Sequence, residues 1–386
     1  MYNPMQSYII NTIEEFEAMN NHWKALFSID DQNPLPLCFE WLYSWWKVFK
    51  SDKQLHIICV YENGHAIAIA PMMREEISYR GFKVDCIKLM ANGHSPFCGI
   101  IYRSNLTFAK KYSALECIIN ACKSDLLIFN KIAKDSLTYE MLKHMDLPMG
   151  FHRGTKPSLL TPFIHTSGDW DLFFQNRPRR FRKNIHNKIN RIIKAKDFSV
   201  TEYKIHSSSD PIFEEIIDVS KNSWKYQLES DLSSKPESKD FIASLIDQFG
   251  PDGAIHIWIL RKHGKAIAFE LQVHFNGVAY PIRADFDDHY RQFSPGSVLE
   301  YEAIKALFNN ESIQFYNSCA DNYWYLHNWT NEIRERVTFE IFPKTSKSLL
   351  LYVVEHIGIR YLRELKMLVI KIFNKDETQF ATSEHK

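Results

Sequence analysis

A pair of apolar segments separated by a glycine turn occurs once in each half of the sequence. In the first half the turn is Asn63-Gly64, a dipeptide that strongly favours a β-hairpin. In the second half His263-Gly264 separates strands predicted at residues 255–261 and 265–274. Helices are predicted before each hairpin, and a strand, a helix and another strand after it. This shared order predicts an α/β fold of two related halves, with mixed, mostly antiparallel sheets flanked by helices.

The length of 386 residues exceeds what one hydrophobic core usually serves, which predicts more than one domain. Residues 148–162 contain three prolines and two glycines, and we expect them to bridge the halves. The predicted units are residues 1–160, residues 161–345, and a C-terminal helix and tail at residues 346–386. The apolar and basic C-terminal helix is predicted either to cover the core or to lie on a membrane surface.

The amino-acid composition argues against several classes of protein. Hydrophobic residues make up 45% and charged residues 24%, as in ordinary globular chains. The 47 basic and 46 acidic residues nearly cancel, which argues against a nucleic-acid binder of strongly basic overall charge. No signal peptide and no apolar run of about 20 residues, the length of a membrane span, are found. The seven scattered cysteines and the lack of an H-x-x-x-H pattern predict a cytoplasmic protein with reduced thiols and no metal site.

Residues 278–310 carry the strongest sign of a ligand site. A predicted strand enters a loop, and the loop places Ser294-Pro295-Gly296-Ser297 at the start of a helix. The N–H groups and the dipole of a helix N-terminus bind phosphate, and a glycine allows the backbone to come close to it. Alternatively, the same residues serve only to cap the helix.

The run from Arg177 to Lys196 contains nine basic residues and no acidic one. Apolar residues recur along it at helical spacing, which predicts an amphipathic helix that packs on the protein. Its basic face is either merely solvated or attracts an anionic acceptor such as a nucleotide-linked sugar, CoA or a lipid headgroup. Nucleic acid is less well supported, because the run has few aromatic residues for base stacking. On the acceptor reading, the contacting residues are Arg179, Arg180 and Arg182.

Several short motifs occur in a characteristic order. They are Arg177–Lys183, Trp224-Lys225, Gly264–Ala268, Phe286-Asp287 with Tyr290 and Ser294-Pro295-Gly296, and, in the first half, Trp41-Leu42 with Trp45-Trp46. In order and spacing they resemble the acetyltransferase domain of the CelD/BcsL-type family, also called BioF-like, which is found beside bacterial polysaccharide-biosynthesis genes. The resemblance spans most of residues 30–345. It implies two halves of the GNAT fold, with the acyl-CoA site in the second.

The resemblance further implies transfer of an acyl group from acetyl-CoA or another acyl-CoA to an amine or hydroxyl. The acceptor is expected to be small and polar or sugar-like, in polysaccharide or cell-envelope biosynthesis. The CoA pyrophosphate is expected at Arg291, Ser294, Gly296 and Ser297. Further contacts to the acceptor are expected from Trp224, Asp287 and Tyr290.

In such enzymes a carboxylate accepts the proton of the acceptor, and a tyrosine can protonate the leaving thiolate. The candidates for the base are Asp285 and Glu270, and the candidate acid is Tyr325. Alternatively, the two carboxylates are ion-paired side chains of strands, and the tyrosine is a core or cleft-lining residue.

The sequence departs from the family after the last predicted loop. The family has a Tyr-Lys pair there, whereas this chain reads Ala-Asp-Asn-Tyr-Trp-Tyr at residues 320–325, within a helix predicted at 322–333. Two rival functions therefore stay open. Fem-type transferases, which share paired GNAT halves, use aminoacyl-tRNA, and the basic helix would then contact RNA. Otherwise, the fold is a degenerate binding protein without catalysis.

Overall fold

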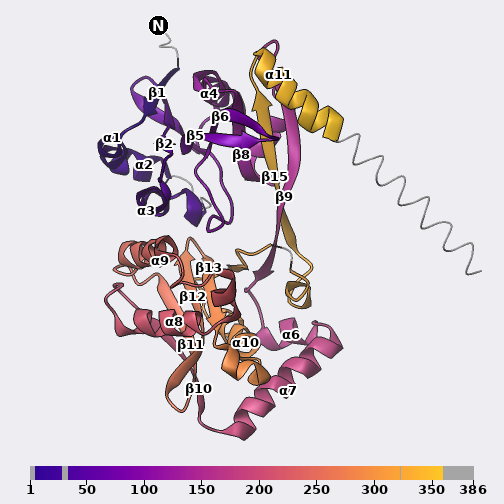
Figure 1. Ribbon diagram of the computed structural model, residues 1–386. Helices are drawn as coiled ribbons and strands as arrows, with labels where there is room; N and C mark the ends of the chain where they lie inside the picture. Colours follow the sequence, from indigo (N-terminus) through magenta and orange to yellow (C-terminus); the bar gives the residue numbers. More distant parts are fainter. Residues whose placement is uncertain (1–4, 28–33, 322, 360–386) are drawn as a thin grey trace, which may run out of the picture.

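The structure is a computed structural model that describes residues 5–27, 34–321 and 323–359. It shows two halves, one above the other in Figure 1, joined by two long strands. The helices of the first half are α1 (Ile13–Ala18), α2 (Asn20–Phe27), α3 (Phe39–Phe49), α4 (Phe108–Ala121) and α5 (Leu137–His144). Its strands are β1 (Gln6–Ile10), β2 (Gln54–Leu55), β3 (Ile57–Glu62), β4 (His65–Ala70), β5 (Met72–Tyr79), β6 (Phe82–Leu89), β7 (Ile101–Tyr102) and β8 (Leu126–Ala133).

The second half repeats this order of elements. Its helices are α6 (Trp170–Gln175), α7 (Arg179–Ala195), α8 (Pro211–Lys221), α9 (Pro236–Phe249) and α10 (Pro295–Leu307). Its strands are β10 (Phe198–Lys204), β11 (Ile255–Lys262), β12 (Lys265–Phe275), β13 (Val278–Phe286) and β14 (Phe315–Asn317). The strands β9 (His152–His165) and β15 (Ile333–Phe342) run between the halves, and α11 (Ser346–Tyr352) follows β15.

Both predicted hairpins are present. The β3–β4 turn has Asn63 at φ 51° and Gly64 at φ 77°, and the β11–β12 turn has His263 at φ 47° and Gly264 at φ 80°. Two consecutive residues with positive φ make the turn whose twist matches a hairpin. The glycine is needed at the second position, where a Cβ would be strained.

Eleven strands form one sheet in the order β10-β11-β12-β13-β14-β9-β15-β8-β6-β5-β2, and a smaller sheet has the order β1-β3-β4-β7. Among the ladders of the described strands, β6/β8 and β13/β14 are parallel and the others are antiparallel. Helix α4 connects the first parallel pair and α10 the second. The predicted α/β architecture, with mixed, mostly antiparallel sheets flanked by helices, is therefore confirmed.

The expected bridge at residues 148–162 is mostly a strand. From His152 onward, β9 pairs with β15, and its last three residues pair with β14. Pro157 is tolerated there because the β9/β15 register shifts between Glu335 and Val337, where the regular ladder is interrupted. Prolines and glycines are uncommon inside strands, so the local sequence pattern does not predict this strand.

The helix expected at 322–333 is also corrected, apart from residue 322, which lies outside the described residues. The structure has a single 3₁₀ turn at Leu326–Asn328, and β15 begins at Ile333. That one turn is enough to bury both Leu326 and Trp329.

The two halves pack together through α3 and α9, which face each other in Figure 1. The Trp41 and Phe241 rings meet edge to face, with centroids 5.3 Å apart, and the Ser244 hydroxyl donates to the Ser44 hydroxyl at 2.8 Å. Buried side chains of both halves form one apolar cluster. This shared core holds the second half against the first.

The C-terminal segment, as far as residue 359, packs on the first half. Leu351 is buried beside Phe342 of β15. Beyond α11, Glu355 pairs with Arg80, and its Oε1 also lies 3.1 Å from Lys156 Nζ. The remainder of the predicted C-terminal helix and tail lies outside the described residues.

Candidate functional site

An unpaired strand edge lies at the centre of the second half. Strands β13 and β14 pair only at Val278–Phe315 and Ala279–Tyr316. β13 then continues to Phe286 while β14 ends at Asn317. Within the described part of the chain, no strand pairs with the rest of β13 on that side. The Ala284 carbonyl accepts a hydrogen bond from Lys225 Nζ at 2.8 Å, and the remainder of the edge is open to a ligand.

The equivalent place in the first half is filled by protein. There β6 and β8 pair in parallel, and the segment after β6 folds back so that Cys98 bridges Ile132. The Lys131 ammonium group donates to the carbonyl oxygens of Asn92, at 2.7 Å, and Ser95. The two halves share their topology, but the opening is available in the second half.

The predicted pyrophosphate loop lies at the N-terminus of α10, next to the unpaired edge. Ser294 adopts a left-handed conformation at φ 52°, and its carbonyl accepts the N–H groups of Ser297 and Val298 at 3.1 and 3.3 Å. The N–H of Gly296 has no partner among the described residues. Its φ is not left-handed, and a Cβ added there would touch the Phe286 ring at 3.4 Å. The helix start therefore offers one backbone donor, fewer than the sequence led us to expect.

Basic residues from α7 surround this loop. The Lys188 ammonium group donates to the Ser297 hydroxyl at 3.0 Å, and Arg191 donates to the Gln292 carbonyl. Burial lowers the pKa of Lys188, as expected for a cation partly removed from water. Arg291 is exposed and pairs with Asp288 at 2.9 Å. The loop and α7 together form a cationic surface around the Gly296 N–H.

The three arginines predicted to bind the acceptor lie at the other end of α7. Arg179 and Arg180 are exposed, and Arg182 donates to the Arg177 carbonyl at 3.1 Å. The structure thus brings Lys188 and Arg191 of α7 to the loop, and not these three arginines.

Glu270 is buried on β12 in a polar cluster. Its Oε1 accepts hydrogen bonds from the Gln272 amide at 2.7 Å and from the Tyr316 hydroxyl at 3.3 Å. Burial raises the pKa of Glu270 to about 8, and the neighbouring Glu300 adds to the shift. A carboxyl group that exchanges its proton near neutral pH suits a general base or acid.

Glu300 and Tyr325 complete this cluster. Glu300, on α10, accepts the Trp329 indole N–H at 3.0 Å, and burial raises its pKa to about 7. Tyr325 is 42% exposed. Its pKa rises to about 12 because of burial, then because of Glu300, Tyr323 and Glu270. The cluster therefore reaches the surface at Tyr325, a suitable position for a proton donor to a leaving group.

Asp285, the other candidate base, lies on the opposite face of the sheet. It is paired with Phe269, the residue before Glu270, and paired residues share a face. Its carboxylate is 2.5 Å from Lys225 Nζ and 2.7 Å from Arg283 Nε, and accepts the Ser220 hydroxyl at 2.6 Å. Its carboxylate is thus engaged in two ion pairs and a hydrogen bond within the protein. The structure does not bring the two candidate carboxylates together.

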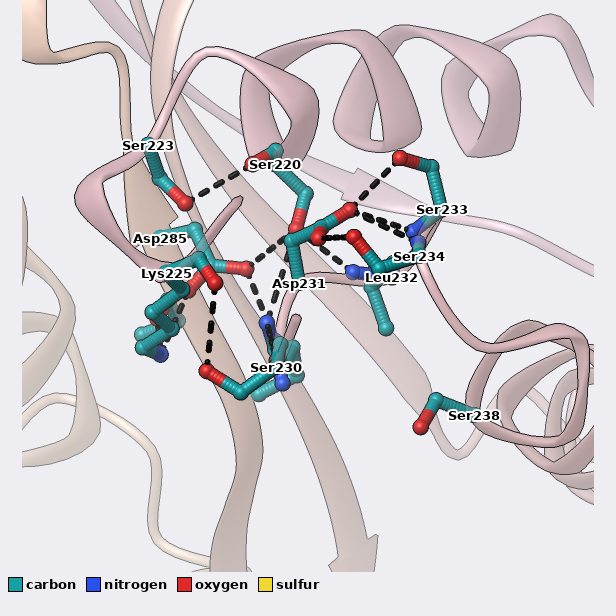
Figure 2. Close-up of polar contacts among 12 residues, drawn as sticks. Ser220, Ser223, Lys225, Ser230, Asp231, Leu232, Ser233, Ser234, Ser238 and Asp285 are labelled. Atoms are coloured by element: carbon teal, nitrogen blue, oxygen red, sulfur yellow. Dashed lines mark hydrogen bonds and ion pairs between the residues drawn. The ribbon is translucent and has the colours of Figure 1, made fainter. Parts of the chain in front are cut away.

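Asp285 organises the loop between α8 and α9 (Figure 2). Ser220 donates to Asp285 and accepts the Leu232 N–H at 2.9 Å, and Arg283 donates to the Ser230 carbonyl at 2.8 Å. Beside this network lies a pocket of about 710 Å³. Its lining residues are Lys221, Tyr226, Gln227, Glu229, Ser233 and Ser234.

The remaining predicted contacts lie in the segments that follow α8 and β13. Trp224 is exposed at the start of the α8–α9 loop. Asp287 is buried and caps the turn after β13, where its Oδ1 accepts the His289 N–H at 3.0 Å. Tyr290 packs on the core, with Lys265 5.8 Å above its ring. Asp287 and Tyr290 thus shape the loop that leads to α10.

Sequence reasoning missed Lys188, Glu300 and Tyr316, because tertiary folding alone brings them to the site. One local signal was present. Residues 269–275 read Phe-Glu-Leu-Gln-Val-His-Phe, which places polar residues at alternate positions of a strand that is buried on both faces.

Among the described residues, no group of three or more His, Cys, Asp or Glu side chains could hold a metal ion. None of the helices described is long and apolar enough to cross a membrane.

Comparison with known proteins identifies the kind of domain. Residues 179–325 match a family described as "Acetyltransferase (GNAT) domain". No curated protein matches the sequence. The match identifies an acyltransferase domain of the GNAT superfamily in the second half and confirms the prediction of an acyltransferase.

Three solved structures have a similar fold, each at 12% sequence identity. FemX has a TM-score of 0.55 and covers 91% of this chain and 99% of its own. The C-terminal domain of a putative lysylphosphatidylglycerol synthetase from Agrobacterium fabrum has a TM-score of 0.53, covering 88% and 96%. A conserved protein of unknown function from Bacteroides thetaiotaomicron has a TM-score of 0.55, covering 87% and 100%. Identities this low show a shared fold, and the CelD/BcsL-type resemblance stays a prediction.

Proposed function

We propose that the second half binds an acyl-CoA along the unpaired edge of β13 and transfers its acyl group to an amine or hydroxyl. One observation carries the proposal. Glu270, buried and with its pKa raised to about 8, is hydrogen-bonded to Tyr316, the last residue of β14 paired with β13. A group poised to exchange a proton therefore lies where the strand edge becomes free.

The phosphate groups of the acyl-CoA would bind at the start of α10. Gly296 supplies a backbone N–H, while Lys188 and Arg191 supply positive charge beside it. When bound, acyl-CoA supplies the thioester. Glu270 would accept the proton of the acceptor, and Tyr325 would protonate the leaving thiolate.

The body of the acceptor would bind on the Asp285 side, in the pocket next to the α8–α9 loop, and its amine or hydroxyl would reach Glu270 on the other face across the unpaired edge of β13. Exposed Trp224 and Tyr226 and the hydroxyls of Ser233 and Ser234 offer stacking and hydrogen bonding. This chemistry suits a small polar or sugar-like acceptor and agrees with the CelD/BcsL-type resemblance and a role in polysaccharide or cell-envelope biosynthesis. The seven free thiols favour a reducing, cytoplasmic compartment.

Titration calorimetry with acetyl-CoA tests the cofactor site. Replacing Gly296 by Val, or Lys188 by Gln, should each weaken acetyl-CoA binding by roughly 10- to 100-fold, because a charge-assisted hydrogen bond contributes about 1.5–3 kcal/mol. Gly296→Val should fold, since Gly296 is not left-handed and a Cβ there meets only the Phe286 ring, at 3.4 Å.

The matched control is Lys183→Gln, which removes an exposed cation from the same helix. It should bind acetyl-CoA as wild type does, apart from a small effect at low salt. Wild-type affinity in folded Gly296→Val and Lys188→Gln proteins would place the cofactor elsewhere. A wild-type protein that binds neither acetyl-CoA nor longer thioesters would favour the non-catalytic reading.

A Fem-type transfer from aminoacyl-tRNA is the second candidate. The similarity in fold to FemX over 91% of this chain favours it. The exposed Arg179 and Arg180, at the start of α7, also favour it. On this reading α7 contacts RNA phosphates instead of a small anionic acceptor.

Salt-dependent binding of bulk tRNA distinguishes the two candidates. If α7 binds RNA, replacing Arg179, Arg180 and Arg182 by Gln should weaken binding at low salt. The slope of log affinity against log salt should become less steep by about 1 for each lost phosphate contact. Replacing Lys194 and Lys196 at the other end of α7 is the control. No tRNA binding, or an unchanged slope in the triple variant, would rule out this mode of RNA recognition.

A further inference from the structure

A row of polar side chains lies along β12, inside the protein. Glu270, Gln272 and His274 occupy alternate positions of the strand. The Gln272 amide nitrogen donates to Glu270 Oε1 at 2.7 Å, and His274 Nε2 lies 2.8 Å from Gln272 Oε1. Glu270 and Gln272 are buried, and Gln272 is fully enclosed. The three side chains form one hydrogen-bonded chain that ends on the proposed base.

The orientation of the Gln272 amide sets the direction of both hydrogen bonds. Its nitrogen donates to Glu270 Oε1, so its oxygen is left to accept, and His274 Nε2 carries the hydrogen. Burial, and then the nearby His256 and Lys204, lower the pKa of His274 to about 3. His274 is therefore neutral, with its Nε2–H as donor.

The row extends from His274 to the surface. The His256 ring on β11 stacks on His274, with centroids 3.7 Å apart. His256 Nδ1 lies 2.6 Å from the carboxylate of Glu202, which is partly exposed on β10. The polar row thus begins at the sheet surface and runs through three strands to Glu270.

Such a row contributes less to folding than apolar side chains would, because each buried amide or imidazole loses hydration that its hydrogen bonds only offset. The alternate positions of the same strand, Phe269, Leu271 and Val273, are filled by apolar side chains that avoid this cost. A polar row in this place points to a functional requirement.

We propose that Gln272 and His274 are positioning residues that hold the Glu270 carboxylate in one orientation for accepting the acceptor's proton. Gln272 contacts the carboxylate directly, and His274 acts through Gln272 by fixing which end of the amide faces Glu270. This inference rests on the proposed function of Glu270 as the base.

Infrared titration of the protonated Glu270 carboxyl tests the hydrogen-bonded chain without any substrate. The band is assigned by its absence in Glu270→Gln. The groups facing Glu270 are Gln272 on the same strand, Glu300 from α10, and Tyr316, Cys319 and Tyr325 from β14 and the segment after it. In Gln272→Met the midpoint should shift to higher pH, because a donor that favours the charged form is lost.

Two substitutions of His274 isolate its role. His274→Leu should shift the midpoint in the same direction by less, since Gln272 remains but is free to rotate. His274→Gln keeps an N–H donor and should restore the wild-type midpoint. The Gln227→Met variant, on the exposed α8–α9 loop, is the control and should leave the midpoint unchanged.

Kinetics with acetyl-CoA and an amine or hydroxyl acceptor test the catalytic role. Gln272→Met should lower kcat about 10- to 100-fold with unchanged acetyl-CoA affinity, and should have no further effect in a Glu270→Gln background. Melting temperatures measured in parallel distinguish a specific loss of kcat from general destabilisation of the protein.

The possible results distinguish a failure of this inference from a failure of the proposed base. Unchanged infrared midpoints in Gln272→Met and His274→Leu would overturn the inference, even if both variants melt earlier. A shifted midpoint with unchanged kcat would also overturn it, because the orientation of Glu270 would not matter for transfer. If Glu270→Gln itself retains full activity, the proposed base is wrong, whatever the infrared titration shows.

Discussion

Glu270→Gln should lower kcat by about 100- to 10,000-fold, the usual range for loss of a general base. Glutamine has nearly the same shape and keeps an oxygen that can accept from Gln272 and Tyr316, but it cannot take up a proton. Acetyl-CoA affinity should be unchanged, because Gly296 and Lys188 lie on α10 and α7. Steady-state kinetics and calorimetry together check this separation.

The pH dependence of kcat/KM in the wild-type enzyme should also report the ionisation of Glu270. If deprotonated Glu270 is active, kcat/KM should rise with pH up to about 8 and then level off, since the pKa of Glu270 is raised to about 8 by burial and by Glu300. This rise should be absent in Glu270→Gln. The control is Glu311→Gln, which removes an exposed carboxylate and should keep the wild-type profile.

The raised pKa of Glu270 also affects the stability of the folded protein. An unfolded glutamate has its ordinary pKa near 4.5, so folding favours the protonated form. The contribution of Glu270 to stability is therefore fully present below about pH 4.5 and is lost as pH rises through about 8. Glu270→Gln should unfold at a higher temperature than wild type at pH 9, with a smaller difference at pH 5. A variant that is less stable at pH 9 would contradict the raised pKa.

Local sequence pattern predicted those parts of the fold that depend on nearby residues. Asn63-Gly64 and His263-Gly264 each specify a turn by backbone conformation alone, and both hairpins formed. The bridge at residues 148–162 could not be recognised as β9, because its strand partner is β15, far along the sequence. Pairing at long range, together with two prolines in the strand, overrode the local signals.

The candidate site was predictable only in part, for a similar reason. Glu270 is one of the two carboxylates that the sequence offers as a base. Its partners Tyr316 and Glu300 come from β14 and α10, and only the folded chain brings them within reach. Asp285 was an equally good candidate in the sequence. Its buried cation partners, Lys225 and Arg283, give it a different role.

Asp285→Ala should cause the largest loss of stability, about 3–5 kcal/mol, the usual cost of removing one partner from a buried ion pair. The side chains of Lys225 and Arg283 would be left in a mostly buried setting without their carboxylate partner. Ser220 would also lose its acceptor at 2.6 Å, and this hydroxyl links Asp285 to the Leu232 N–H of the α8–α9 loop (Figure 2). We expect an earlier thermal transition and faster amide exchange in that loop.

Two further variants separate the structural role of Asp285 from a catalytic one. Asp218→Ala removes an exposed ion pair with Lys221 and should change stability by less than about 1 kcal/mol. Asp285→Asn keeps the shape and one acceptor for Ser220, so it should lose less stability than Asp285→Ala. If Asp285 organises the loop, activity in these variants should fall together with loop order, and the pH profile of the remaining activity should be unchanged. A stable Asp285→Asn protein with an ordered loop and no activity would instead make Asp285 the base, since only the loss of proton acceptance could then explain the result.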